Sequence, residues 1–147
     1  MAYKRKTWSQ KWAEAVAKPD LPKIINCPES NERFVVPNPA EVEQVVRRVP
    51  LGEVVSMSTI AGEIARKHGT ESCCPMTTGI FAWLLAHAAV DGSDPKLVDV
   101  PWWRVVKAKG ELNMKYPNAP DLQKSLLEAE GKTVAQRGSK FFVAGVP

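Results

Sequence analysis

Long apolar runs are absent from this chain of 147 residues. A helix that crosses a bilayer needs roughly 20 consecutive apolar residues. No stretch of the sequence approaches that length, so we expect no membrane-spanning helix. The basic N-terminus is not followed by an apolar stretch, which predicts that it is not a secretory signal. Repeats and low-complexity segments are also missing, so nothing indicates an array of repeated units.

Cysteine is scarce as well. The three cysteines, Cys27 and the adjacent Cys73 and Cys74, do not form a disulfide framework, and this favours a reducing cytoplasm. Adjacent cysteines are poor partners for a metal, because the usual pair is separated by about two to four residues. The sequence therefore predicts neither a metal site nor a cofactor.

The remaining composition is that of an ordinary globular domain. Hydrophobic residues make up 44% and charged residues 24% of the sequence, and a chain of this length supports one domain with a substantial core. The 20 lysines and arginines exceed the 16 acidic residues and give a net charge of +4. Such a charge fits a nucleic-acid partner, although many soluble proteins are equally basic.

Apolar side chains recur at helical spacing in five segments. Prolines, glycines and capping residues mark the ends of these segments. Short runs rich in β-branched residues predict extended segments, and alternation on both sides of Gly138 predicts a terminal hairpin. The predicted helices span 7–18, 39–48, 56–68, 76–89 and 121–130, the extended segments 34–36, 53–55 and 98–106, and the hairpin 133–143.

The segment Pro101-Trp102-Trp103-Arg104-Val105-Val106 resembles the Pro-Cys-His-Arg-Val-Val signature of the O6-alkylguanine-DNA alkyltransferases. Further segments, in the family's order, are similar to parts of its helix-turn-helix and to the end of its DNA-binding domain. These segments are 49–55, 62–66, 77–79 and 126–131, so that the resemblance covers roughly residues 40–131.

This resemblance implies an α+β, mostly helical fold. Its main part would be a winged helix-turn-helix DNA-binding domain over residues 39–147, which ends in the C-terminal β-hairpin. Residues 1–38 would form an N-terminal helical extension of that domain.

The chain departs from the family at the positions that carry the chemistry. The family's acceptor cysteine falls on Trp102, and the histidine that activates it falls on Trp103. A thiolate can accept an alkyl group by displacement, whereas the only polar group of an indole is an N–H donor. The related alkyltransferase-like proteins share the change from cysteine to tryptophan and bind alkylated DNA without repairing it. The resemblance therefore implies that this protein is not an enzyme.

One enzymatic alternative is open at this point. Cys73 or Cys74 could be a displaced alkyl acceptor, because both precede a predicted helix and a helix N-terminus lowers the pKa of a thiol. Neither cysteine lies in the family's acceptor segment, so we favour the interpretation without catalysis.

The resemblance also implies a lesion pocket. Trp102 can be either the wall of that pocket or part of the core, and Trp103 is favoured as a core residue. Met76 falls on the family's finger arginine and can be an apolar wedge between base steps or a core residue. The predicted pocket residues are Trp102, Trp103, Arg104, Met76 and Tyr116.

Two further expectations concern the surroundings of that pocket. We expect Arg104 to have a structural role in an ion pair with Glu130, because the histidine that this glutamate would polarise is missing. The stretch between Gly79 and Pro101 is longer than in the family. We therefore expect the loop over residues 91–100 to decide access to the pocket.

A DNA-facing surface is predicted on the helix-turn-helix. Threonine hydroxyls at the start of its second helix can donate to phosphate, and a glycine there allows close approach. Cations at the end of the first helix and on the turn after the signature can also reach phosphates. Those at the end of the first helix can equally be explained by their favourable interaction with the helix dipole. The predicted residues are Thr77, Thr78, Gly79, Arg66, Lys67, Lys107 and Lys109.

Three functions fit these patterns. We favour non-enzymatic binding of double-stranded DNA, with recognition of O6-alkylguanine or another modified base by nucleotide flipping. The first alternative is a DNA-binding or regulatory module without lesion recognition, and the second is a protein-interaction domain on a retained fold. We expect a cytoplasmic monomer that is associated with the nucleoid when bound to DNA, with a repair protein as a further candidate partner.

Overall fold

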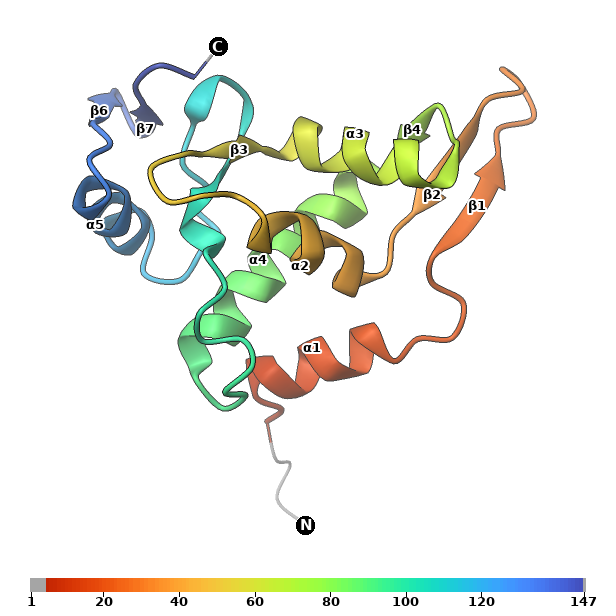
Figure 1. Cartoon of the computed structure of the whole chain (residues 1–147), viewed down its shortest axis with the longest axis horizontal. Coiled ribbons are helices and arrows are strands. Elements are labelled where there is room, and N and C mark those ends of the chain that lie inside the picture. The colour runs from red at the N-terminus through yellow and green to blue at the C-terminus, as the bar shows by residue number, and fades with distance from the viewer. Residues whose placement is uncertain (1–4, 147) are drawn as a thin grey trace.

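Helix α4 (Pro75–Asp91) runs through the middle of the molecule, and the other elements pack around it (Figure 1). The computed structural model describes residues 5–146. Helices α1 (Trp8–Val16), α2 (Pro39–Arg47) and α3 (Met57–His68) all contact α4. α4 is apolar on nearly every side, which is the pattern of a helix enclosed by its neighbours.

Local signals in the sequence explain where α2 and α3 begin and end. The Asn38 side chain accepts a hydrogen bond from the Ala40 N–H, and the Glu41 carboxylate accepts one from the Asn38 N–H, which forms a capping box at the start of α2. Ser56 caps α3. α3 ends at Gly69, whose φ of 67° is a left-handed conformation that glycine adopts without steric penalty.

Small sheets join the segments between the helices. β1 (Lys23–Asn26) pairs antiparallel with β2 (Arg33–Val36), and β2 pairs in parallel with β4 (Ser72–Cys73), which links α3 to α4. β3 (Val55–Ser56) pairs in parallel with β5 (Val105–Val106). The pairing of β3 with β5 brings the signature segment beside the start of α3.

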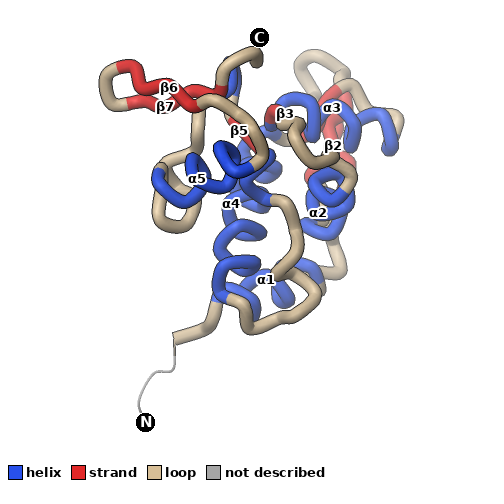
Figure 2. Tube along the Cα trace, turned by 60° about the vertical axis from the view of Figure 1, so that its left-hand side comes forward, coloured by secondary structure: helices blue, strands red, loops and turns tan. Residues whose placement is uncertain are grey.

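The C-terminal part contains α5 (Asp121–Ala129) and an antiparallel hairpin of β6 (Val134–Arg137) and β7 (Lys140–Val143). Figure 2 shows α5 and the hairpin together on one side of the molecule. β7 contacts a short 3-10 turn, η2 (Ala108–Gly110). Within residues 5–146, no helix has the length and apolarity to cross a membrane.

The N-terminal segment shares the hydrophobic core of the rest of the molecule. Trp12 of α1 and Val35 of β2 are 4% and 0% exposed, and they belong to one apolar cluster with Ile60 and Leu85. Residues 5–38, the described part of the segment predicted as an extension, therefore contribute side chains directly to the core.

The predicted α+β, mostly helical fold is confirmed, and all five predicted helices and the terminal hairpin are present. The prediction of an extended segment over 98–106 is wrong for most of its length. Its middle forms a 3-10 turn, η1 (Trp102–Arg104), which the Arg104 N–H closes by donating to the Pro101 carbonyl at 3.1 Å. The sequence leaves the region of β1 open between irregular and extended structure, because β1 is exposed along its length. It does not predict β4, which has only 2 residues.

Candidate nucleic-acid interface

Helices α3 and α4 meet at their N-terminal ends and leave the start of α4 open. Met76 is 74% exposed and Ile80 is 41% exposed. A Cβ atom built on Gly79 would lie 3.8 Å from Cε of Met57 on α3, which is an ordinary contact, so helix packing does not require glycine at this position. The interpretation of Met76 as a core residue is wrong, because its side chain projects from the surface.

Of the two threonines predicted to face DNA, Thr78 points inward. Its side chain is fully buried, and its hydroxyl donates to the Cys74 carbonyl at 2.8 Å and lies 3.3 Å from Cys73 Sγ. The prediction that Thr78 contacts phosphate is therefore wrong, because α4 turns this position toward the core. Thr77 is half-buried, with its hydroxyl 3.1 Å from Cys74 Sγ.

The surroundings of Cys73 do not favour an alkyl acceptor. Burial raises the pKa of the Cys73 thiol, and the contact with Thr78 only partly opposes this effect. A raised pKa lowers the fraction of thiolate, which is the nucleophilic form. In the described part of the chain, no three His, Cys, Asp or Glu side chains gather in a way that could hold a metal ion.

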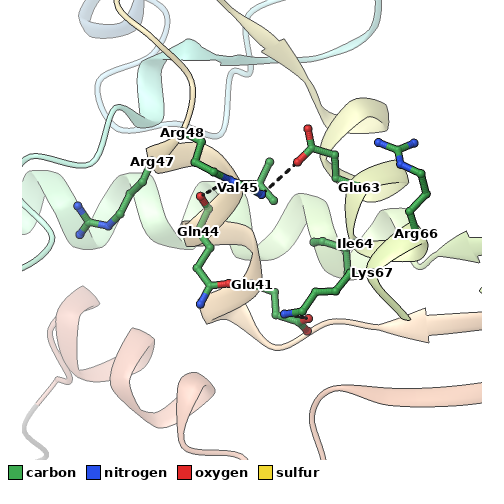
Figure 3. A pocket seen from close by; sticks show the side chains of 9 residues that line it. All are labelled: Glu41, Gln44, Val45, Arg47, Arg48, Glu63, Ile64, Arg66 and Lys67. Atoms are coloured by element: carbon green, nitrogen blue, oxygen red, sulfur yellow. Dashed lines mark hydrogen bonds and ion pairs between the residues drawn. The ribbon is translucent and has the colours of Figure 1, made fainter. Parts of the chain in front are cut away.

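A hollow of about 790 Å³ lies between α2 and α3, and cations at the end of α3 line it (Figure 3). Lys67 Nζ lies 3.0 Å from Glu41 Oε2, and an Arg48 guanidinium nitrogen lies 3.2 Å from Glu63 Oε2. Arg66 forms no ion pair within residues 5–146. The carboxylates neutralise much of the positive charge here, so Arg66 is the cation of α3 best available to a phosphate.

Glu41 ties the start of α2 to the end of α3. This 6%-exposed residue accepts the Asn38 N–H at 3.0 Å, and its other oxygen lies 3.0 Å from Lys67 Nζ and 2.6 Å from His68 Nε2. Burial alone would raise the pKa of this carboxyl, but the hydrogen bonds outweigh it and hold the pKa below its ordinary value. Our sequence analysis missed this group, which the capping-box spacing of Asn38 and Glu41 signals.

Trp102 is enclosed by other aromatic rings. It is 4% exposed, and the centroids of the Tyr116 and Trp103 rings lie 5.5 and 6.0 Å from its own, both in edge-to-face geometry. Tyr116, in the loop before α5, is itself buried, and this burial raises the pKa of its hydroxyl. Of the two interpretations of Trp102, the one that assigns it to the core describes this structure.

The predicted pocket residues do not all come together. Ala86 and Ala89 of α4 complete the cluster around Trp102. Met76 lies ten residues before Ala86 on the same helix, roughly 15 Å along its axis at 1.5 Å per residue. Trp102, Trp103, Arg104 and Tyr116 thus form one group, and Met76 stands apart from it.

No apolar residue of the loop over residues 91–100 belongs to the cluster around Trp102. α4 continues to Asp91 and takes up part of the additional length. Leu97 and Val100 are 3% and 0% exposed and belong to the main apolar cluster, together with Trp12 of α1. The expectation that this loop decides access to Trp102 stays a prediction, and the structure places Tyr116 and Trp103 against that ring.

Trp103, Arg104 and Glu130 form one hydrogen-bonded group. The Trp103 indole N–H donates to Glu130 Oε2 at 2.9 Å, and Arg104 donates to the same oxygen at 2.7 Å. Arg104 also donates to the Val49 carbonyl at 2.7 Å. The Arg104 guanidinium, assisted by the Trp103 N–H, holds the pKa of Glu130 below its ordinary value although burial opposes this. The expected pair of Arg104 with Glu130 is confirmed, and Trp103 is half-buried with its polar edge engaged.

Gln123 of α5 fixes the turn that carries the two tryptophans. It is 1% exposed, and its amide group donates to the carbonyls of Trp103 and Val105 at 3.0 Å each. Our sequence analysis missed this residue, because a glutamine on an amphipathic helix is ordinarily on the solvent side and no motif marks it.

Lys107 and Lys109 are exposed on the turn after β5. Val106 of β5 pairs with Ser56, the residue that caps α3, so this turn lies next to the start of the helix-turn-helix. Lys107 Nζ lies 3.7 Å from a carboxylate oxygen of Glu111. Lys109 forms no ion pair within the described residues.

Comparisons with known proteins identify a family and a fold for this chain. Residues 37–132 match the family described as 6-O-methylguanine DNA methyltransferase, DNA binding domain. A structure of S. pombe ATL in complex with DNA is 24% identical over 74% of this chain and 89% of that chain, with a TM-score of 0.52, and shows the same fold. S. pombe Atl1 in complex with damaged DNA containing O6-carboxymethylguanine is 25% identical over 71% and 85% of the two chains, with a TM-score of 0.49. No curated protein sequence matches the chain significantly.

Proposed function

The chain belongs to the family of 6-O-methylguanine DNA methyltransferase DNA-binding domains, and from this premise we propose that it recognises an alkylated or otherwise modified base in duplex DNA without accepting the alkyl group. The observation that carries the proposal is the pair of tryptophans in the acceptor segment. Trp102 offers no nucleophile. The N–H of Trp103 is bound to Glu130 at 2.9 Å.

An exposed methionine supports the flipping of a nucleotide. Met76 projects from the first turn of α4 with 74% of its surface exposed. Apolar side chains of this kind insert between base steps and hold a duplex open. A wedge at the start of α4 would fill the space that an extruded base leaves.

The burial of Trp102 adds a free-energy cost to the recognition of a base at this ring. A base can stack on this ring only if a neighbouring side chain moves, because Trp102 is 4% exposed in a cluster with Tyr116, Ala86 and Ala89. Stacking on an aromatic ring contributes roughly 1–3 kcal/mol, which is similar to the few kcal/mol needed to extrude a nucleotide. Contacts with the DNA backbone must therefore supply most of the affinity.

A competition titration tests the proposal. A labelled duplex that contains O6-methylguanine is displaced by the same duplex with and without the lesion, and the intact mass of the protein is measured afterwards. We expect the lesion duplex to compete more strongly and the protein mass to stay unchanged. A stoichiometric gain of one methyl group, on Cys73 or Cys74, would contradict the absence of transfer.

Met76 provides a matched pair of variants for this titration. We expect Met76→Ala to reduce the preference for the lesion duplex by about tenfold, which corresponds to ~1.4 kcal/mol. Val98→Ala is the control, because Val98 is 53% exposed but lies on the loop beyond the other end of α4. An equal effect of both variants would remove Met76 from the recognition step.

The enclosed position of Trp102 favours a second candidate function, namely a DNA-binding module without lesion recognition. The same titration separates the two, because this module would bind both duplexes equally and with a strong dependence on salt. A protein that binds neither duplex would support the third possibility, a protein-interaction domain on a retained fold.

A further inference from the structure

A hollow of about 520 Å³ lies between η2 and the β6–β7 hairpin. Two cations, Lys109 and Arg137, line it together with Phe142 and the chain from 143 to 146, and none of the lining residues within 5–146 carries a carboxylate. Each of the other four hollows described for this structure contains at least one carboxylate. Cations without a neighbouring carboxylate create a positive potential that attracts an anion.

The hairpin is built firmly onto η2. The Leu112 N–H donates to the Phe141 carbonyl at 2.8 Å. Gly110 makes the close approach possible, because a Cβ atom at this position would lie 2.7 Å from the Val143 carbonyl oxygen. Val143 itself is 2% exposed in an apolar cluster with Leu127. The hollow is therefore a fixed feature of the fold.

The cations around the hollow are available to a ligand. The Arg137 guanidinium carbon lies 5.3 Å from the centre of the Phe142 ring, which orients this side chain by a cation–π interaction. Neither Arg137 nor Lys109 forms an ion pair within residues 5–146. Two further cations, Lys107 and Lys140, share the single carboxylate of Glu111 at 3.7 and 4.0 Å. Exposed pairs at such distances are weak.

The position of this cationic group suits a long ligand. Figure 1 shows the loop that carries η2, coloured cyan, beside β3 and the C-terminal segment. β3 leads directly into α3, and β5 pairs with it. The loop with η2 therefore lies near the start of the helix-turn-helix. Two of the cations, residues 137 and 140, lie beyond the matched family region of 37–132.

We infer that η2 and the β6–β7 hairpin form a phosphate-binding site that holds the backbone of duplex DNA, through Lys109 and Arg137 in the hollow and through Lys107 and Lys140 at its rim. This inference rests on the proposed binding of DNA and adds a second contact to it. Contacts with phosphate are independent of sequence, so the site adds equal affinity for damaged and undamaged duplexes.

The test uses the full chain and two duplexes of one sequence, with and without O6-methylguanine. Affinities are measured at several salt concentrations for the wild type and for the double variant Lys109→Ala, Arg137→Ala. Removing one cation from a phosphate reduces the steepness of log K against log salt by about 0.9, so we expect a decrease of about 1.8. The preference for the lesion duplex should stay the same, and Arg137→Lys alone should keep most of the slope because it keeps the charge.

The control is the double variant Lys18→Ala, Lys96→Ala, which removes the same charge from exposed positions on other elements. An unchanged slope in the hairpin variant, or an equal decrease in the control, would overturn the inference while the proposed binding of DNA stands. Salt-independent or absent binding by the wild type would instead contradict the proposed function itself. Thermal unfolding of each variant verifies that these exposed substitutions leave the fold intact.

Discussion

By the resemblance of the signature segment, Trp102 and Trp103 fall on the positions of the family's thiol and imidazole, and we expect each to remove a different part of the reaction. Trp102 removes the nucleophile, and its ring packs against Tyr116. Trp103 removes the base, because an indole nitrogen can donate a hydrogen bond but cannot accept a proton. The Trp103 N–H instead donates to Glu130, so the surrounding network is stable without an imidazole.

It follows that a thiol alone would not restore alkyl transfer. We expect Trp102→Cys to gain no methyl group from an O6-methylguanine duplex, as measured by intact mass, because no side chain in the Trp103 position can take the proton of the thiol. Only a variant that also carries Trp103→His would have an acceptor and a base together. Loss of the large ring should cost about 3–5 kcal/mol of stability, so thermal unfolding must first verify the fold. Stoichiometric methylation of the single variant would contradict the prediction.

Glu130 should make a pH-dependent contribution to stability. Its pKa in the folded protein lies below the ordinary value of 4.5 because of Arg104. The stabilisation is therefore complete above that ordinary value and is lost as the pH falls through the lower, folded-state pKa. We expect Glu130→Gln to lower the free energy of unfolding by about 2–3 kcal/mol at pH 7 and by progressively less below pH ~4.3.

Urea unfolding at a series of pH values measures this difference. Glu128→Gln is the matched control, because Glu128 lies two residues before Glu130, at the end of α5, and is exposed. A constant difference between Glu130→Gln and the wild type down to pH ~3 would show that the charge of Glu130 does not stabilise the fold.

Exposed and buried side chains alternate within the first turns of helix α4. Met76 and Ile80 face solvent, whereas Thr78 and Phe81 are buried. The helical repeat of 3.6 residues explains this division, because positions two residues apart point to nearly opposite sides. The exposed side is available for a DNA groove, and the buried side holds the helix in the core through the hydrogen bond of Thr78 to the Cys74 carbonyl.

Thr78 therefore should affect stability and not DNA binding. We expect Thr78→Val to lower the free energy of unfolding by about 1 kcal/mol, because it removes one buried hydrogen bond at nearly constant volume. Affinity for duplex DNA should be unchanged, in contrast to the effect of Met76→Ala on lesion preference. A loss of affinity for Thr78→Val, measured at a temperature well below the unfolding transition, would return this residue to the DNA-facing surface.

The molecule as a whole is organised around one main core that the N-terminal segment completes. α1 covers the C-terminal half of α4, where Ser9 hydrogen-bonds to the Ala88 carbonyl at 3.4 Å. β2 pairs with β4, the strand inside the helix-turn-helix. The DNA-binding unit is thus braced at both ends of α4 by residues that precede the matched family region.

Removal of a core side chain from this segment should weaken the entire fold. We expect Trp12→Ala to lower the free energy of unfolding by about 3–5 kcal/mol in a single transition seen by both far-UV circular dichroism and fluorescence. Ile24→Ala in β1 is the control, since Ile24 is 49% exposed and should cost under about 1 kcal/mol. Two separate transitions, with only one shifted by Trp12→Ala, would mean that the N-terminal segment folds independently.

Periodicity and caps were sufficient to place the five helices and the terminal hairpin, because these features depend on neighbours in the chain. The pair of Arg104 with Glu130 was predictable only through the resemblance to the family. Tertiary packing decided the rest. It turned Thr78 inward, folded the tryptophans into a 3-10 turn under Tyr116, and separated Met76 from them along α4. It also placed Lys109 of η2 and Arg137 of β6 around the same hollow. Such contacts depend on how segments far apart in the sequence pack against one another, and no local sequence pattern predicts this packing.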